Sequence, residues 1–129
     1  MTSTLGYWAM RGRAQPIRLL LSYAGEEFKD ELYELSPDSW EAWLKVKPTL
    51  GYDFPNLPYY TDGKVKLTQS TAILSYTGEK HGLGGSNQEE KAKLACINGA
   101  ATFRLHISLS ITTTVFPLSE AWRMVIENV

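Results

Sequence analysis

A tyrosine and a tryptophan end the first stretch of the chain that favours a β-strand. Residues 2–9 are rich in β-branched and aromatic side chains, and Tyr7 and Trp8 come just before the polar segment 10–13. In open α/β sheets, ligands bind beyond the carboxyl ends of the strands, so a hydroxyl at this position could donate a hydrogen bond to an anion. The alternative is that both rings belong to the core, where aromatic side chains are commonly buried.

Gln69 and Ser70 form a second candidate site, where strand-like residues give way to a helical pattern. The first N–H groups of a helix have no partner within the helix and carry partial positive charge. Together with a serine hydroxyl and an amide, they make a small site for a carboxylate. The competing interpretation is that Ser70 is an ordinary N-cap, which is the commoner use of serine at such a position.

Two further groups suit a peptide-like ligand. Trp43 and Lys47 are four residues apart, so on a helix they share a face that could hold an apolar stem and a carboxylate. Asn56, Leu57 and Pro58 open a predicted hairpin, and a cis bond before the proline would leave the Leu57 backbone free to pair with a ligand. The simpler alternatives are a solvated lysine beside a half-buried tryptophan, and a proline that merely precedes a strand.

The elements that must position these residues follow from periodicity and turn signals. Strands are expected over residues 2–9 and 28–35. The first helix begins at Gln15 and the second at Ser36, each next to a proline that suits a first helical turn. Apolar residues of the first helix recur at i, i+3, i+4 and i+7, which predicts one buried face.

A hairpin and a third helix complete the predicted unit. Residues 57–68 read as two strands joined at Asp62-Gly63, which suits a two-residue type I′ turn. The helix that begins at Gln69 ends near Lys80, with His81 expected to cap its carbonyl groups. The resulting β-α-β-α-β-β-α order predicts an α/β fold, a thioredoxin-like domain with a mixed four-stranded sheet and helices on both faces.

The remainder of the chain shows a different pattern. Ser86 and Glu89 have the spacing of a capping box, which predicts a fourth helix through residue 101. Beyond Arg104, apolar and polar residues alternate with a period of two, which predicts a strand over 105–116 and a boundary near position 104. A helix-like piece is expected after Pro117.

Composition excludes several classes of protein. The chain has 129 residues with 13 basic and 14 acidic side chains, which suits about one domain and argues against nucleic acid as the main partner. The single cysteine, Cys96, excludes an internal disulfide and a CxxC redox pair, and it is expected to be a small buried residue. No metal site, signal peptide or membrane-spanning segment is expected.

Taken in order, these motifs resemble cytosolic glutathione transferases of the mu class. The resemblance is carried by Leu5-Gly6-Tyr7-Trp8, Arg11-Gly12, Gln15-Pro16-Ile17-Arg18, Asp53-Phe54-Pro55-Asn56-Leu57-Pro58-Tyr59, Leu67-Thr68-Gln69-Ser70-Thr71-Ala72-Ile73-Leu74 and Lys80-His81-Gly82. It runs from about residue 5 to residue 101. The loop between the second strand and the second helix is closer in length to that of invertebrate forms.

The resemblance implies a thioredoxin-like, glutathione-binding domain over residues 1–83, the start of an all-helical C-terminal domain over 84–104, and a divergent tail over 105–129. It implies that the protein conjugates the glutathione thiol to electrophiles, with Tyr7 donating to the sulfur. The other implied glutathione-binding residues are Trp8 at the border of the site, Trp43 and Lys47 at the glycine end, Asn56 and the Leu57 backbone with Pro58 cis, and Gln69 and Ser70 at the γ-glutamyl carboxylate.

The same resemblance implies a cytoplasmic detoxification enzyme that acts as a homodimer and uses glutathione as a substrate, with no cofactor. The chain departs from the family pattern near residues 100–104, where the expected acidic residue is lacking, and beyond Arg104, where the resemblance ends. A truncated chain of this kind is expected to be an impaired catalyst. The alternative function is a non-catalytic module that binds glutathione or a protein.

Overall fold

The computed structural model describes the backbone of residues 1–115 and the side chains of residues 1–103. Its sheet contains β1 (Ser3–Trp8), β2 (Phe28–Tyr33), β3 (Tyr59–Thr61) and β4 (Lys66–Thr68) in the order β2-β1-β3-β4. β1 is parallel to β2 and antiparallel to β3, and β3 is antiparallel to β4. The predicted mixed, thioredoxin-like sheet is therefore confirmed.

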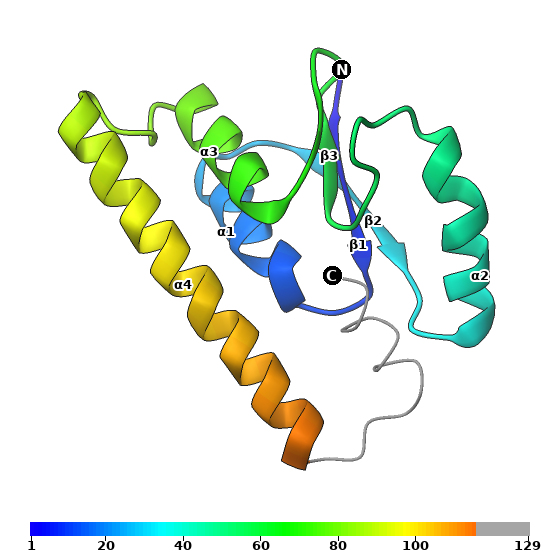
Figure 1. The fold of residues 1–129 in the computed structure, drawn as a ribbon. Helices are drawn as coiled ribbons and strands as arrows, with labels where there is room; N and C mark the ends of the chain where they lie inside the picture. The colour runs from blue at the N-terminus through cyan, green and yellow to red at the C-terminus, as the bar shows by residue number, and fades with distance from the viewer. Residues whose placement is uncertain (116–129) are drawn as a thin grey trace.

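Helices cover both faces of this sheet, as expected. α1 (Gln15–Tyr23) and α3 (Ser70–Lys80) lie on one face and α2 (Pro37–Val46) lies on the other, while α4 (Gln88–Val115) runs outside α1 and α3 (Figure 1). Two short 3-10 turns, Gly12–Ala14 and Lys47–Thr49, precede α1 and follow α2. None of the described helices combines the length and the apolarity that a membrane span needs.

The core differs in composition between the two faces of the sheet. Ile17 and Leu21 of α1 and Ile73 of α3 are fully buried, as the helical periodicity requires, and belong to one core with Leu5 and Tyr60 of the sheet. Beneath α2 the core is aromatic, with Trp8 stacked on Trp40, Trp43 stacked on Tyr59, and Tyr33 edge-on to both Trp8 and Trp43. Trp8, which directly follows Tyr7, belongs to this aromatic part of the core.

The hairpin differs from its prediction in its turn. Thr61 pairs with Lys66, so four residues, and not two, connect β3 to β4. The Asp62 carboxylate accepts hydrogen bonds from the backbone N–H groups of Lys64 and Val65, and its second oxygen accepts from the Tyr76 hydroxyl. The aspartate side chain thus replaces ladder hydrogen bonds and widens the turn.

The predicted strand over 105–116 is wrong, because α4 continues through Val115. A period of two also contains i, i+4 pairs, and extending an existing helix costs less than starting a new element. The helix-like piece predicted after Pro117 lies outside the described residues. Two smaller expectations also fail: Asn87, not Ser86, caps α4 through its hydrogen bond from the Glu90 N–H, and Cys96 is exposed.

A charged cluster ties α3 to the end of the sheet opposite Tyr7. The Glu26 carboxylate accepts hydrogen bonds from Ser3, Tyr60 and Lys80, and it also contacts the His81 ring. His81 occupies the C-cap position of α3, as predicted, and its backbone N–H donates to the Thr77 carbonyl at 3.2 Å, while its side chain pairs with the Glu26 carboxylate. Lys80 also forms an ion pair with Asp62 at 3.3 Å. The cluster joins four segments that are far apart in the sequence.

The Glu26 cluster makes a prediction about acid stability. Burial raises the pKa of the Glu26 carboxyl, but its hydrogen bonds outweigh burial and lower the pKa from 4.5 to about 2. Because the folded-state pKa is the lower one, the stabilisation is present above about pH 4.5 and disappears as the pH falls toward 2. Glu26→Gln should lower the free energy of unfolding at pH 7 by about 2–3 kcal/mol and flatten its decline below pH 5.

Urea unfolding followed by circular dichroism between pH 2 and pH 7 measures this effect. Glu27→Gln, at an exposed neighbouring position, is the matched control and should leave the pH profile unchanged. Equal profiles for the wild type and Glu26→Gln would show that the cluster contributes nothing to acid stability.

Candidate functional site

Tyr7 lies near the end of β1, and the loop that follows β1 packs against its side chain. Its side chain is 5% exposed, and its hydroxyl accepts a hydrogen bond of 3.3 Å from the Arg13 N–H. Gly12, with a φ of +40°, lies against the phenol ring, and a Cβ atom at this position would be 2.7 Å from the hydroxyl oxygen. The glycine therefore lets the loop approach the hydroxyl closely.

The Tyr7 hydroxyl is suited to remain protonated. Burial raises the pKa of Tyr7 above its ordinary value, although the Arg13 N–H and the positive charges of Arg13 and Arg18 act in the opposite direction. A phenol that accepts one hydrogen bond still has its own proton to donate. The hydroxyl can therefore act as a hydrogen-bond donor toward an anion at the end of β1.

A cavity of about 430 Å³ lies beside this loop. It is bounded by the loop after β1, by α1, by the start of α3 and by α4, and it is mostly apolar. The lining residues are Arg11, Gly12, Arg13, Gln15, Pro16, Leu19, Ser70, Leu74, Asn98, Ala101 and Thr102. Gly12 and Arg13, which both lie against the Tyr7 hydroxyl, thus share a cavity with Ser70, one of the predicted site residues.

The start of α3 has the geometry that an anion site needs. Gln69 occupies the N-cap position, with a φ of 70°, and Ser70 is the first helical residue, so Ser70 is not the N-cap. Among the described residues, no side chain caps this end of α3. The first N–H groups of α3 are consequently left for solvent or for a ligand.

The predicted tryptophans are mainly packing residues in the aromatic part of the core. Trp8 and Trp43 are 4% and 2% exposed, and Tyr33 contacts both of their rings. Lys47 is partly exposed and directly follows α2. The structure thus links Trp8 and Trp43 through one aromatic cluster, while their roles toward a ligand, and that of Lys47, stay predictions.

The Asn56–Leu57 segment lies just before β3. The bond between Leu57 and Pro58 is cis, and the Leu57 N–H donates to the Asn56 side-chain oxygen at 2.9 Å. The preceding loop is fixed to β4 by a hydrogen bond of 2.6 Å from the Thr68 hydroxyl to the Phe54 carbonyl. A ligand that accepts a hydrogen bond from the Leu57 N–H must therefore displace the Asn56 oxygen or share this N–H with it.

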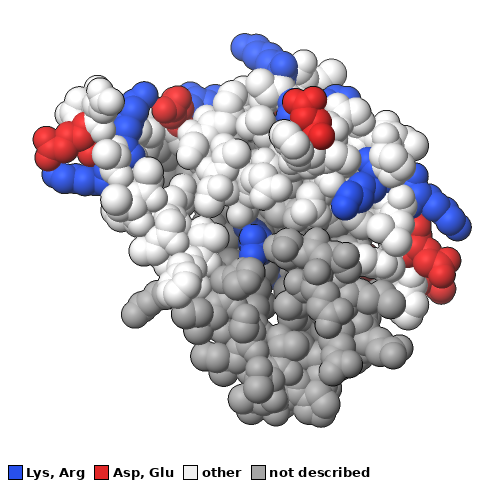
Figure 2. Space-filling model, in the orientation of Figure 1, with Lys and Arg blue, Asp and Glu red and all other residues white. Residues whose placement is uncertain are grey.

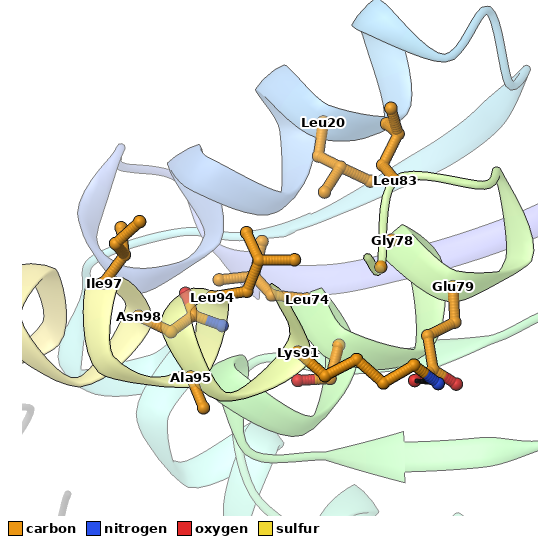
Figure 3. A pocket seen from close by; sticks show the side chains of 12 residues that line it. Leu20, Leu74, Gly78, Glu79, Leu83, Lys91, Leu94, Ala95, Ile97 and Asn98 are labelled. Carbon is orange, nitrogen blue, oxygen red and sulfur yellow. Dashed lines mark hydrogen bonds and ion pairs between the residues drawn. The ribbon is translucent and has the colours of Figure 1, made fainter. Parts of the chain in front are cut away.

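A second cavity, of about 210 Å³, lies farther along the groove between α1, α3 and α4. Figure 3 shows Leu20, Leu74, Leu94 and Ile97 gathered around it, with the Lys91 side chain extended toward Glu79, its ion-pair partner at 3.1 Å. Figure 2 shows basic and acidic side chains mainly in the upper and outer parts of the molecule, with a basic side chain near the middle of the view and uncharged residues over much of the area between them. Neither the apolar lining nor the single ion pair suggests catalysis there.

Sequence reasoning missed the groups that surround the Tyr7 hydroxyl. The Arg13 N–H is a backbone group, which residue types do not reveal, and Asn98 and Thr102 reach the larger cavity from a helix about 90 residues away. A glycine in the polar segment directly after β1 was the available signal, because a glycine there often marks a close backbone approach.

Comparison with known proteins matches the sequence of this chain to one family. Residues 3–79 match the family described as the N-terminal domain of glutathione S-transferase. The chain is 54% identical over 101 residues to the class-mu 26 kDa isozyme 1 of Fasciola hepatica and 50% identical over 97 residues to glutathione S-transferase Mu 1 of Oryctolagus cuniculus. These alignments cover 78% and 73% of this chain, and 44% of each relative.

Solved structures agree with the sequence matches. A Nu-class enzyme from Haemonchus contortus aligns with a TM-score of 0.66 at 29% identity, over 83% of this chain and 48% of that one. The glutathione S-transferase from Ascaris lumbricoides aligns with a TM-score of 0.65 at 30% identity, over 84% and 48%. The chain spans about half the length of the relatives that it matches. By its matched domain, its fold and its relatives, this chain belongs to the glutathione S-transferase family.

Proposed function

We propose that the chain binds reduced glutathione across the carboxyl end of β1 and the start of α3, and lowers the pKa of its thiol for attack on electrophiles. The observation that carries this proposal is the buried Tyr7 hydroxyl at the end of β1, whose contacts Gly12 and Arg13 line a cavity that also reaches Ser70. The lining of this cavity includes the loop that contacts the Tyr7 hydroxyl and the first residue of α3, a helix whose N-cap residue makes no side-chain capping bond. They suit a ligand with a thiol at one point and a carboxylate at another.

In the proposed complex, the γ-glutamyl carboxylate accepts hydrogen bonds from the first N–H groups of α3 and from the side chains of Gln69 and Ser70. The cysteinyl part pairs with the Leu57 backbone and with Asn56, and its sulfur faces Tyr7. Lys47 and Trp43 bind the glycine end of glutathione, and Trp8 borders the site. The partial exposure of Asn56, Lys47 and Ser70 leaves each of them accessible to such a ligand.

The energetics of this arrangement are sufficient. A free thiol has a pKa of about 8.5, so only a few per cent is nucleophilic thiolate at neutral pH. Lowering the pKa by about two units requires about 2.7 kcal/mol in favour of the anion. One hydrogen bond to a charged group contributes about 1.5–3 kcal/mol, so the Tyr7 hydroxyl is able to supply most of this difference.

We also propose the division of the chain into a glutathione-binding domain over 1–83, the start of a helical domain over 84–104, and a divergent tail over 105–129. The larger cavity is the proposed place for the electrophile, because it is apolar and adjoins the Tyr7 loop. These 129 residues alone should turn over slowly, since positioning of the second substrate contributes several kcal/mol of catalysis and rests here on few residues. A cytoplasmic, homodimeric detoxification enzyme is the proposed context.

The carboxylate subsite is tested by a double variant. Gln69→Ala combined with Ser70→Ala should weaken glutathione binding by about 1–3 kcal/mol, because a charged group loses two of its partners. Isothermal titration calorimetry measures the change. Ser75→Ala, an exposed serine on the same helix, is the control and should bind like the wild type. If the double variant also binds like the wild type, the carboxylate lies elsewhere.

A further inference from the structure

Arg18 of α1 connects β2 to the loop that covers Tyr7. Its side chain is 13% exposed, and its Nε and Nη2 atoms donate to both carboxylate oxygens of Asp30 at 2.8 and 3.3 Å. The remaining nitrogen, Nη1, donates to the Met10 carbonyl at 2.9 Å, with longer contacts of 3.4 Å to the Arg11 carbonyl and 3.5 Å to the Gln15 side chain. One guanidinium group thus binds a strand and a loop at once.

The loop that Arg18 contacts controls the surroundings of the Tyr7 hydroxyl. Its start is fixed by the Ala9 N–H, which donates to the Tyr33 carbonyl at 2.7 Å, and its end by the Gln15 N–H, which donates to the Arg11 carbonyl at 2.9 Å. Between these points the Arg18 side chain donates a hydrogen bond to the Met10 carbonyl, and the Arg13 N–H donates one to the Tyr7 hydroxyl. Loss of the guanidinium would therefore free the middle of the loop.

We propose that Arg18 is a positioning residue, which holds the loop 10–13 against the Tyr7 hydroxyl through the Met10 and Arg11 carbonyl groups, with Asp30 fixing the guanidinium. The planar guanidinium binds a carboxylate with two nitrogens and keeps a third directed elsewhere, which a lysine ammonium does not reproduce. The positive charge of Arg18 also favours a lower pKa for Tyr7. As a contribution to catalysis, this inference rests on the proposed function; as a contact that orders the loop, it does not.

Amide hydrogen exchange in the ligand-free protein tests the inference without glutathione. In Arg18→Gln, the Arg13 amide should exchange about 10-fold faster relative to the Tyr60 amide of β3, because the loop loses its fixed carbonyl contacts. The Tyr7 pKa should rise, as followed by NMR titration of ¹³Cζ-labelled tyrosine assigned with Tyr7→Phe. Lys29→Gln is the matched control: it removes one positive charge and one exposed ion pair from β2 and should change neither signal.

Asp30→Asn provides a second variant that keeps the arginine in place and loosens its anchor. It should accelerate Arg13 exchange in the same direction, by a smaller factor. Unchanged Arg13 exchange in both variants, or an equal change in Lys29→Gln, would overturn the inference. If Arg13 exchange responds as expected but the wild type does not bind glutathione, the proposed function fails while the positioning role of Arg18 stands.

Discussion

Tyr7→Phe is expected to raise the pKa of the bound glutathione thiol by about one to two units while affinity for glutathione changes little. The hydroxyl is the only polar part of this side chain, and the buried ring keeps its packing in the variant. Near pH 7 the thiolate fraction, and with it the rate of conjugation, should fall about 10- to 100-fold. The effect arises in the chemical step, so binding and reactivity should separate.

Ultraviolet titration of the bound thiolate, read beside calorimetric affinity, measures both quantities on the same protein. Tyr23→Phe is the matched control, because Tyr23 is exposed at the end of α1 and loses the same hydroxyl group. It should leave the thiol pKa unchanged. An identical thiol pKa in the wild type and in Tyr7→Phe would mean that Tyr7 serves only to pack the end of β1.

Gly6→Ala should be the most destabilising single-methyl addition that the structure predicts. A Cβ atom on Gly6 would be 2.2 Å from two atoms of the Tyr59 ring, and that ring is confined by Trp43 and Tyr52. Neither the strand nor the ring can move aside without disturbing the sheet and the aromatic core. We expect a loss of about 3 kcal/mol in the free energy of unfolding, at the upper end of the usual range for overpacking.

Gly99→Ala is the matched control for Gly6→Ala, because it adds the same methyl group at another glycine of the chain. Gly99 lies in α4, and a Cβ atom at this position would have no neighbour within 4 Å outside its own helix backbone, so the added methyl group should stabilise the protein by about 0.5–1 kcal/mol through helix propensity. Chemical denaturation of the two variants and the wild type gives both differences. Equal stability of Gly6→Ala and the wild type would contradict the close approach of β1 to Tyr59.

The sequence was sufficient to predict the scaffold because its local signals agree with one another. Pro16 and Pro37 occupy first helical turns, Ser36 caps α2 as its type suggests, and the apolar spacing of α1 matches its buried face. Each of these features depends on neighbouring residues only. They were enough to predict the order of strands and helices that places Tyr7 near the carboxyl end of β1.

Features that depend on distant residues could not be predicted in this way. Glu26 and His81 are 55 positions apart, so nothing near His81 indicated that its side chain would bind a carboxylate while its backbone caps α3. In the turn after β3, the Asp62 carboxylate that accepts the backbone hydrogen bonds also bonds to Tyr76 and Lys80 of α3, which the Asp-Gly pair alone does not reveal. The period of two beyond Arg104 suited a strand locally, but α4 had already begun 17 residues earlier.

Calorimetric titration of this chain with reduced glutathione, combined with titration of the bound thiol, tests the central claim most directly. It does not depend on turnover, which is expected to be slow for these residues alone. The account predicts one binding site per chain, and a thiol pKa at least about one unit below the value near 8.5 of a free thiol. Absence of binding, or binding with an unshifted thiol pKa, would contradict the claim that the end of β1 activates glutathione.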